Sequence, residues 1–73
     1  MSHTDVTLDV RGLPPPEPME RCLDQLAVLD SGQSLHLLID REPHPLFAIL
    51  ERQGYAWTCA PDNGHFRVTI RSQ

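Results

Sequence analysis

The stretch Leu8-Asp9-Val10-Arg11-Gly12-Leu13-Pro14-Pro15-Pro16-Glu17-Pro18 joins two segments that have different hydrophobic periods. Residues 4–10 alternate between apolar and polar side chains, which is typical of a half-buried strand. A residue before proline is driven out of the α region, so we expect residues 13–15 to be extended. Pro16 and Pro18 are tolerated in a first helical turn, where their missing N–H groups would have no partner. The stretch therefore predicts a stiff connection from a strand to a helix.

The segment after the prolines has the period of an amphipathic helix. Its apolar residues recur at intervals of three and four: Met19, Cys22, Leu23, Leu26 and Ala27. Glu17 and Glu20 lie near its start, where acidic side chains interact favourably with the helix dipole. We expect this helix to end near Leu29-Asp30, with Ser31-Gly32 as the stop.

A second strand and helix follow the same plan. Residues 34–39 are apolar enough for a central strand. The segment Asp40-Arg41-Glu42-Pro43-His44-Pro45 again sets two prolines two positions apart ahead of an apolar helix, and Gly54 suits the position after that helix. Only the Pro-x-Pro element is shared, so this is a weak internal echo rather than a repeat.

The last third of the chain predicts a hairpin. Residues 55–60 and 65–71 alternate, and Pro61-Asp62-Asn63-Gly64 between them is a strong turn sequence. A right-handed crossover makes the first two strands parallel. We therefore predict an α/β (α+β) two-layer sandwich of order β-α-β-α-β-β, a mixed sheet of four strands with both helices on one face and the last strand at or near an edge. Residues 1–73 form a single domain with flexible ends at 1–4 and 72–73.

Composition excludes several function classes. The chain has 73 residues and a formal net charge of -4, and its six basic residues are all arginines. The acidic balance argues against non-specific nucleic-acid binding, and the lack of lysine excludes Schiff-base chemistry. No apolar run approaches the ~20 residues that span a bilayer, and the N-terminus does not resemble a signal peptide. We expect a cytoplasmic protein that binds neither membranes nor nucleic acid.

The pattern Leu8-Asp9-x-x-Gly12-Leu13-x-x-Pro16-Glu17-Pro18 resembles the signature of the TusA-like (SirA-like) sulfur-carrier family, and the likeness extends over nearly the whole chain. That family is a β-α-β-α-β-β sandwich of similar length, and the cysteine of its Cys-Pro-x-Pro motif carries a persulfide. Matching Pro16-Glu17-Pro18 to Pro-x-Pro puts Pro15 at the position of that cysteine. Proline can neither hold sulfur nor donate an N–H, so the resemblance implies a domain that has lost the carrier's nucleophile.

The chain is more similar to a branch of this superfamily that lacks the motif cysteine, a group of uncharacterised bacterial domains. These domains share Leu-Asp-x-Arg-Gly-Leu near the N-terminus and Asp-x-x-Pro-x-Pro-Leu at the second helix. The matching positions here are Asp9, Arg11, Gly12, Asp40, Pro43, Pro45 and Leu46. Such domains often occur beside, or fused to, hemerythrin-like or nitrogen-oxide-related proteins. The resemblance implies a redox or nitrogen-oxide-related pathway and no established activity.

Both predicted helices start at the sheet edge where α/β proteins bind ligands. The residues of the two connections are our candidate surface for a protein partner or a small polar ligand: Asp9, Arg11, Pro15, Pro16, Glu17, Pro18, Arg41, Glu42 and His44. In the alternative interpretation, the two arginines only form ion pairs with Asp9, Asp40 or Glu42 and fix the loops. The prolines remove donors and the glutamates occupy the positive helix end, which weakens an anion site.

We interpret the remaining chemistry-bearing residues as mainly structural. Cys22 is expected in the core, and Cys59 is expected to be a structural strand residue; a sulfur, persulfide or redox role for either is our alternative function. The histidines and cysteines lack metal-ligand spacing, which argues against a metal site. A metal-binding domain is therefore only our second alternative function. His36 is expected on the strand surface, and Tyr55 and Trp57 in the core or on a sheet face.

No catalytic motif, metal ligand or cofactor is predicted. An open sheet face would permit a monomer or a weak homodimer. The sequence as a whole predicts a small, non-catalytic binding or interaction domain that uses the two helix starts as its surface.

Overall fold

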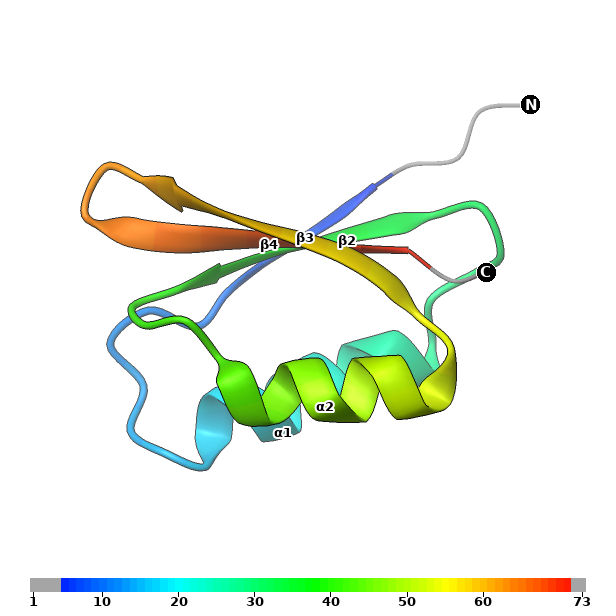
Figure 1. Cartoon of the computed structure of the whole chain (residues 1–73), viewed down its shortest axis with the longest axis horizontal. Coiled ribbons are helices and arrows are strands. Elements are labelled where there is room, and N and C mark those ends of the chain that lie inside the picture. Colours follow the sequence, from blue (N-terminus) through cyan, green and yellow to red (C-terminus); the bar gives the residue numbers. More distant parts are fainter. Residues whose placement is uncertain (1–4, 72–73) are drawn as a thin grey trace.

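The computed structural model describes residues 5–71, so both ends that we expected to be flexible, 1–4 and 72–73, lie outside the described residues. The elements are β1 (Val6–Asp9), α1 (Glu17–Ala27), β2 (Ser34–Ile39), α2 (His44–Gln53), β3 (Ala56–Asp62) and β4 (His65–Arg71). Figure 1 shows both helices on one side of the twisted sheet. The predicted two-layer α+β fold is confirmed.

The strands lie in the order β1-β2-β4-β3. β1 pairs with β2 in parallel, and the β2–β4 and β4–β3 pairs are antiparallel. The last strand, β4, lies near an edge rather than at one, because it is interior and adjacent to β3, and β1 and β3 are the edges. Pro61 lies within β3, and proline lacks a ladder donor, so it is tolerated on an edge strand. β4 instead supplies the fully buried Val68 and Ile70.

β3 extends two residues further into the hairpin than predicted, whereas β4 has the predicted bounds. Asp62 pairs with His65, which leaves a loop of Asn63 and Gly64 alone. Both loop residues have positive φ, 53° and 87°. This is the backbone that suits a tight hairpin between right-twisted strands. The sequence pattern had assigned Pro61 and Asp62 to the turn, whereas the register carries them into β3.

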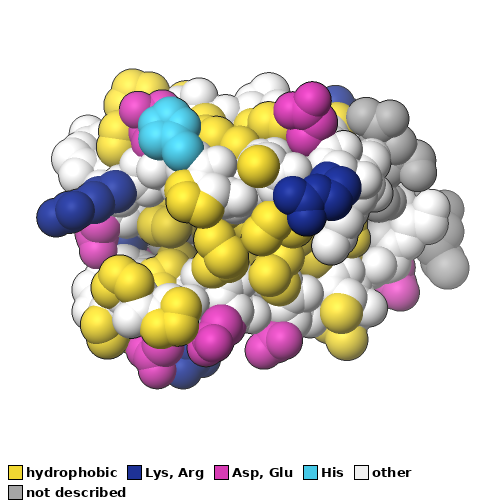
Figure 2. Space-filling view, turned by 60° about the horizontal axis from the view of Figure 1, so that its bottom comes forward, with side chains coloured by type: hydrophobic (Ala, Val, Ile, Leu, Met, Phe, Trp, Pro, Cys, Tyr) yellow, Lys and Arg dark blue, Asp and Glu magenta, His cyan; other side chains and the backbone are white. Residues whose placement is uncertain are grey.

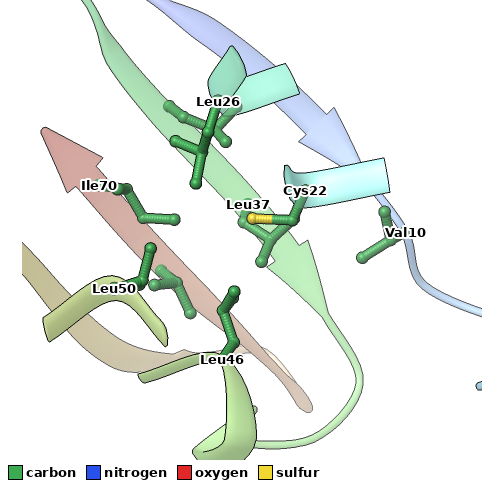
Figure 3. Close-up of a cluster of buried hydrophobic side chains, with 9 residues drawn as sticks. Val10, Cys22, Leu26, Leu37, Leu46, Leu50 and Ile70 are labelled. Carbon is green, nitrogen blue, oxygen red and sulfur yellow. The ribbon is translucent and has the colours of Figure 1, made fainter. Parts of the chain in front are cut away.

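Two rows of inward side chains cross the sheet from β1 to β3. One row is Leu8, Leu37, Val68 and Cys59, and the other is Val6, Leu35, Ile70 and Trp57. Leu46 and Leu50 of α2 and Cys22 and Leu26 of α1 pack on these rows (Figure 3). Val10, immediately after β1, belongs to the same cluster. The core therefore anchors both helices and the start of the first connection.

The sequence predicted the C-terminal end of α2 more accurately than that of α1. α1 ends at Ala27, slightly earlier than expected, because Val28 and Leu29 donate to Gln25 and Leu26 in a tighter last turn. α2 ends at Gln53 with Gly54 as its left-handed cap, as predicted. Among the described residues, no helix is long and apolar enough to cross a membrane.

Candidate functional site

The first connection, residues 10–16, is tied to the sheet and then turns into α1. The Val10 N–H donates to the Leu38 carbonyl at 2.9 Å, and Val10 is 1% exposed. The Pro14 carbonyl accepts the Glu17 N–H at 3.0 Å. The chain therefore turns through Pro15 and Pro16, and the peptide bond between these two residues is cis. The turn is needed because α1 runs back across the sheet.

The second connection, residues 40–43, is shorter than the first, but the helix after it begins with the same arrangement of prolines. Each helix has proline as its N-cap, Pro16 or Pro43, and a second proline in its first turn, Pro18 or Pro45. Neither N-cap has a side-chain hydrogen bond. The Pro-x-Pro spacing therefore marks the start of each helix, as the sequence predicted.

Asp40 joins the two connections. Its Oδ2 accepts the Gly12 N–H at 2.7 Å, across 28 positions in the sequence. Gly12 has φ of +80°, a conformation that costs other L-residues about 1–2 kcal/mol. The sequence analysis gave Asp40 as a possible ion-pair partner and as a position of the family pattern, and did not include it in the candidate surface. The signals for it were an aspartate directly after a buried strand and a glycine three residues after the end of the neighbouring strand.

The amide donors at both helix starts are almost all used internally. In α1, Glu17 donates to Pro14, Glu20 donates to Pro16, and Pro18 has no N–H. In α2, His44 donates to the Glu42 carbonyl, Leu46 donates to Pro43, and Pro45 has no N–H. Among the described hydrogen bonds, Met19 is the first-turn residue whose amide has no carbonyl partner. Helix N-termini bind anions through free N–H groups, so little of that capacity is left here.

A groove of about 640 Å³ lies between the two connections. Its walls are mostly apolar, and six of the lining residues are prolines. The lining residues are Val10, Gly12, Leu13, Pro14, Pro15, Pro16, Pro18, Met19, Ile39, Asp40, Arg41, Glu42, Pro43, Pro45 and Leu46. Figure 2 views the helix side of the molecule and shows hydrophobic side chains gathered over its middle, with Asp and Glu side chains toward the margins.

The structure brings together only part of the predicted surface. Pro15, Pro16, Pro18, Arg41 and Glu42 line the groove. The other four residues, Asp9, Arg11, Glu17 and His44, are not among its lining residues. The apolar members that complete the groove, such as Leu13 and Met19, were missed because their spacing indicated only burial.

Asp9 and Arg11 form a local ion pair. The Arg11 Nη2 and Nε lie 2.8 and 2.9 Å from the Asp9 carboxylate, which also accepts the Arg11 N–H at 3.0 Å. Hydrogen bonding from the Arg11 side chain lowers the pKa of Asp9 to about 2. The alternative interpretation, an ion pair that fixes the loop, is thus confirmed for Arg11. It is wrong for Arg41, which makes no ion pair within residues 5–71.

His44 and Phe47 of α2 and Trp57 of β3 form an aromatic stack between the helix and the edge strand. The His44 ring meets Phe47 edge-on, with centroids 5.6 Å apart, and Phe47 stacks on Trp57 at 5.6 Å and 17°. Tyr55 and Trp57 both pack against the core cluster, so their prediction as core or sheet-face aromatics is confirmed. The aromatic stack holds the edge strand β3 to the helix layer.

Neither cysteine has the surroundings of an activated thiol. Cys22 is fully buried, and burial raises its pKa to about 12. Burial, and then the charge of Glu42, raises the pKa of the half-buried Cys59. A reactive thiolate needs the opposite shift. Within the described part of the chain, no three His, Cys, Asp or Glu side chains are arranged to hold a metal ion.

A second polar cluster lies on the helix-free face of the sheet. His36 Nε2 is 3.0 Å from Asp5 Oδ2, and His36 Nδ1 is 3.3 Å from Thr69 Oγ1. Asp5 also accepts the Ser34 N–H at 3.2 Å, and the hydrogen bond from His36 lowers its pKa. His36 is thus a strand residue on the outer face, as predicted, but its partners were not foreseen.

The carboxylate, imidazole and hydroxyl of this cluster lack the other parts of a hydrolase site. Thr69 lies within β4, between its antiparallel partners β2 and β3. Backbone amides in such a ladder bond to neighbouring strands, so they do not form an oxyanion hole. The cluster therefore ties the residue before β1 to β2 and β4.

A comparison with known protein families identifies the family of the chain. A scan against protein families matches residues 7–72 to the family described as "Uncharacterized conserved protein (DUF2249)". No curated protein and no solved structure matches the chain. The family match spans both connections, the groove and the hairpin. The chain therefore belongs to this DUF2249 family.

Proposed function

We propose that this domain is a non-catalytic binding module and that the groove between the two connections is its binding surface. The observation that carries the proposal is the groove itself, a hollow of about 640 Å³ with proline rings in its walls. Pro14, Pro15, Pro16 and Pro45 are all exposed there. Apolar hollows of roughly 300–1,000 Å³ with a few polar groups are typical of ligand and partner sites.

The lining chemistry supports binding rather than catalysis. The groove's lining residues include no hydroxyl, thiol or imidazole side chain. Asp40, one of its two carboxylates, is engaged with the Gly12 amide. Nucleophilic and general acid–base catalysis both need a positioned, activated side chain beside the reacting atoms. The polar groups are better suited to orienting a bound partner.

The resemblance to TusA-like carriers enters the proposal at Pro15. That residue corresponds to the persulfide cysteine of the carriers and lies in the groove wall. We infer a surface that keeps a carrier-like position for partner binding without the thiol. The expected cytoplasmic location and the redox or nitrogen-oxide-related setting remain predictions from the sequence and its resemblance.

The test is an NMR titration of the isotope-labelled protein with a neutral apolar probe, 3-methylindole. We expect saturable shifts of the Gly12, Met19 and Arg41 amides and none at His36 or Thr69 on the helix-free face. Replacing Pro15→Gln removes a wall ring and should weaken binding about threefold. The matched control is Pro61→Gln, an exposed proline on β3 outside the groove, which should leave binding unchanged. Shifts confined to another surface would overturn the proposal.

A further inference from the structure

We infer that the groove recognises a segment of a partner protein that presents an aromatic side chain next to a basic one. The inference rests on the proposed function and adds the chemistry of the occupant. Three properties of the groove carry it: the loss of anion-binding donors, the balance of charges around it and the proline walls.

The site cannot use the anion-binding capacity that its position suggests. Two helix starts at the carboxyl ends of parallel strands would ordinarily attract phosphate or carboxylate groups. Here Pro18 and Pro45 have no N–H, and the amides of Glu17, His44 and Leu46 donate to carbonyls of their own connections. The Gly12 amide, a further lining donor, is taken by Asp40. Among the first-turn amides of the two helices, an anion would find only that of Met19, together with the Arg41 side chain.

The charges around the groove favour a cation. Asp40 and Glu42 line it together with a single arginine, Arg41. The first turn of α1 adds Glu17 and Glu20. Glu42 has no ion-pair partner among residues 5–71, so its carboxylate remains free to pair with a basic side chain. The chain as a whole carries -4, and this charge also attracts basic partners.

The walls favour a flat ring over an extended aliphatic chain. Proline rings pack against aromatic faces when proline-rich segments bind aromatic grooves. In this domain the relation is reversed, because the prolines form the fixed walls. The volume of about 640 Å³ accommodates an aromatic side chain and part of its neighbour. Aromatic and basic side chains are also the usual anchors of protein interfaces.

The experiment compares three capped tripeptides in which tryptophan is flanked by lysine, by glutamine or by glutamate. Binding to the labelled protein is followed through the Gly12, Met19 and Arg41 amides. We expect the lysine peptide to bind about threefold more tightly than the glutamine peptide. The glutamate peptide should bind most weakly, and the differences should shrink at high salt. Tryptamine supplies the same ring and charge as a small molecule and should bind less tightly than the lysine peptide.

Two matched variants separate the groove charge from the charge of the whole protein. Glu42→Gln should remove most of the preference for the lysine peptide. Glu51→Gln changes the net charge equally, but Glu51 lies in the last turn of α2 and outside the groove, so the preference should remain. Equal loss in both variants would overturn the assignment of Glu42. Spectra of the free variants show whether each has kept the fold.

The possible failures are distinguishable. If the glutamate peptide binds at the groove as tightly as the lysine peptide, the cation preference is wrong and the binding groove stands. If tryptamine binds more tightly than the lysine peptide, the occupant is a small aromatic amine rather than a protein segment. If every probe shifts residues elsewhere, both proposals are wrong.

Discussion

The two strand-to-helix connections begin their helices in the same way and treat their charges differently. In the first, residues 10–16, Arg11 is paired with Asp9 and lies outside the groove. In the second, residues 40–43, Arg41 and Glu42 line the groove and make no ion pair within the described residues. Both put proline at the N-cap and in the first helical turn. Shared prolines therefore set the helix starts, while the neighbouring charges decide which connection can meet a partner.

Truncating the core residues that pack beneath the two connections should lower the free energy of unfolding more than any other change proposed here. Leu46, in the first turn of α2, and Val10, in the first connection, are each 1% exposed. Leu46→Ala should lower the free energy of unfolding by about 2–5 kcal/mol because it leaves a larger cavity. Val10→Ala should cost about 2 kcal/mol. Urea unfolding followed by far-UV circular dichroism measures both, and a larger loss at Val10 would contradict this ranking.

The backbone of the first connection should be more sensitive to substitution than its exposure suggests. Gly12 has φ of +80°, and an added Cβ would meet no atom within 4 Å. Gly12→Ala should therefore destabilise by about 1–2 kcal/mol through backbone strain alone. Asparagine tolerates this conformation better, so Gly12→Asn should cost less. If the two variants unfold at the same urea concentration, strain is not the cause.

The two carboxylates of the second connection should differ in their contribution to stability, because Asp40 accepts a hydrogen bond from the first connection and Glu42 does not. Asp40→Ala removes the acceptor of the Gly12 N–H and should cost about 1 kcal/mol. Glu42→Ala removes a carboxylate two positions away that has no described partner, and it should change stability by less than about 0.5 kcal/mol. Thermal unfolding of the two variants provides the measurement. Equal losses would mean that the Glu42 carboxylate contributes as much to stability as the Asp40 carboxylate that binds the Gly12 amide.

The Asp9–Arg11 ion pair should make the free energy of unfolding depend on pH in the acid range. The folded-state pKa of Asp9 is about 2, below the ordinary value of 3.8. Its contribution is therefore fully present above the unfolded-state pKa and is lost as the pH falls from about 4 toward 2. Asp9→Asn should flatten the curve slightly in that window, because the pair is exposed to solvent.

The control for this measurement is Asp24→Asn on the exposed face of α1. Asp24 makes no ion pair within residues 5–71, so this variant should follow the wild-type acid limb. An identical flattening in both variants would show that net charge, rather than the Asp9–Arg11 pair, sets the acid dependence.

Much of the fold was predictable because its signals are local. The change from alternation to a helical period, the Pro-x-Pro spacing and the Asn63-Gly64 turn each act on a few neighbouring residues. The main error came where one element depends on another: Pro61 extends β3 because the register with Phe66 continues past the expected turn.

The candidate site was predictable in position and only partly in composition. The sheet edge at the helix starts follows from parallel strands and their crossover, and five of the nine proposed residues line the groove there. Burial patterns could not indicate that Leu13 and Met19 also face the groove. They also could not show that Asp9 would satisfy Arg11 locally while Arg41 stayed unpaired.

Local sequence is enough to determine the element order and the two proline-capped helix starts. Only the tertiary structure decides that β4 lies inside the sheet, that Asp40 binds the Gly12 amide 28 positions away and that the two connections enclose a groove. The physical reason is the range of the interactions. Backbone preferences and periodicity are properties of adjacent residues, whereas strand order, paired charges and a shared hollow exist only once both helices have packed on the same sheet.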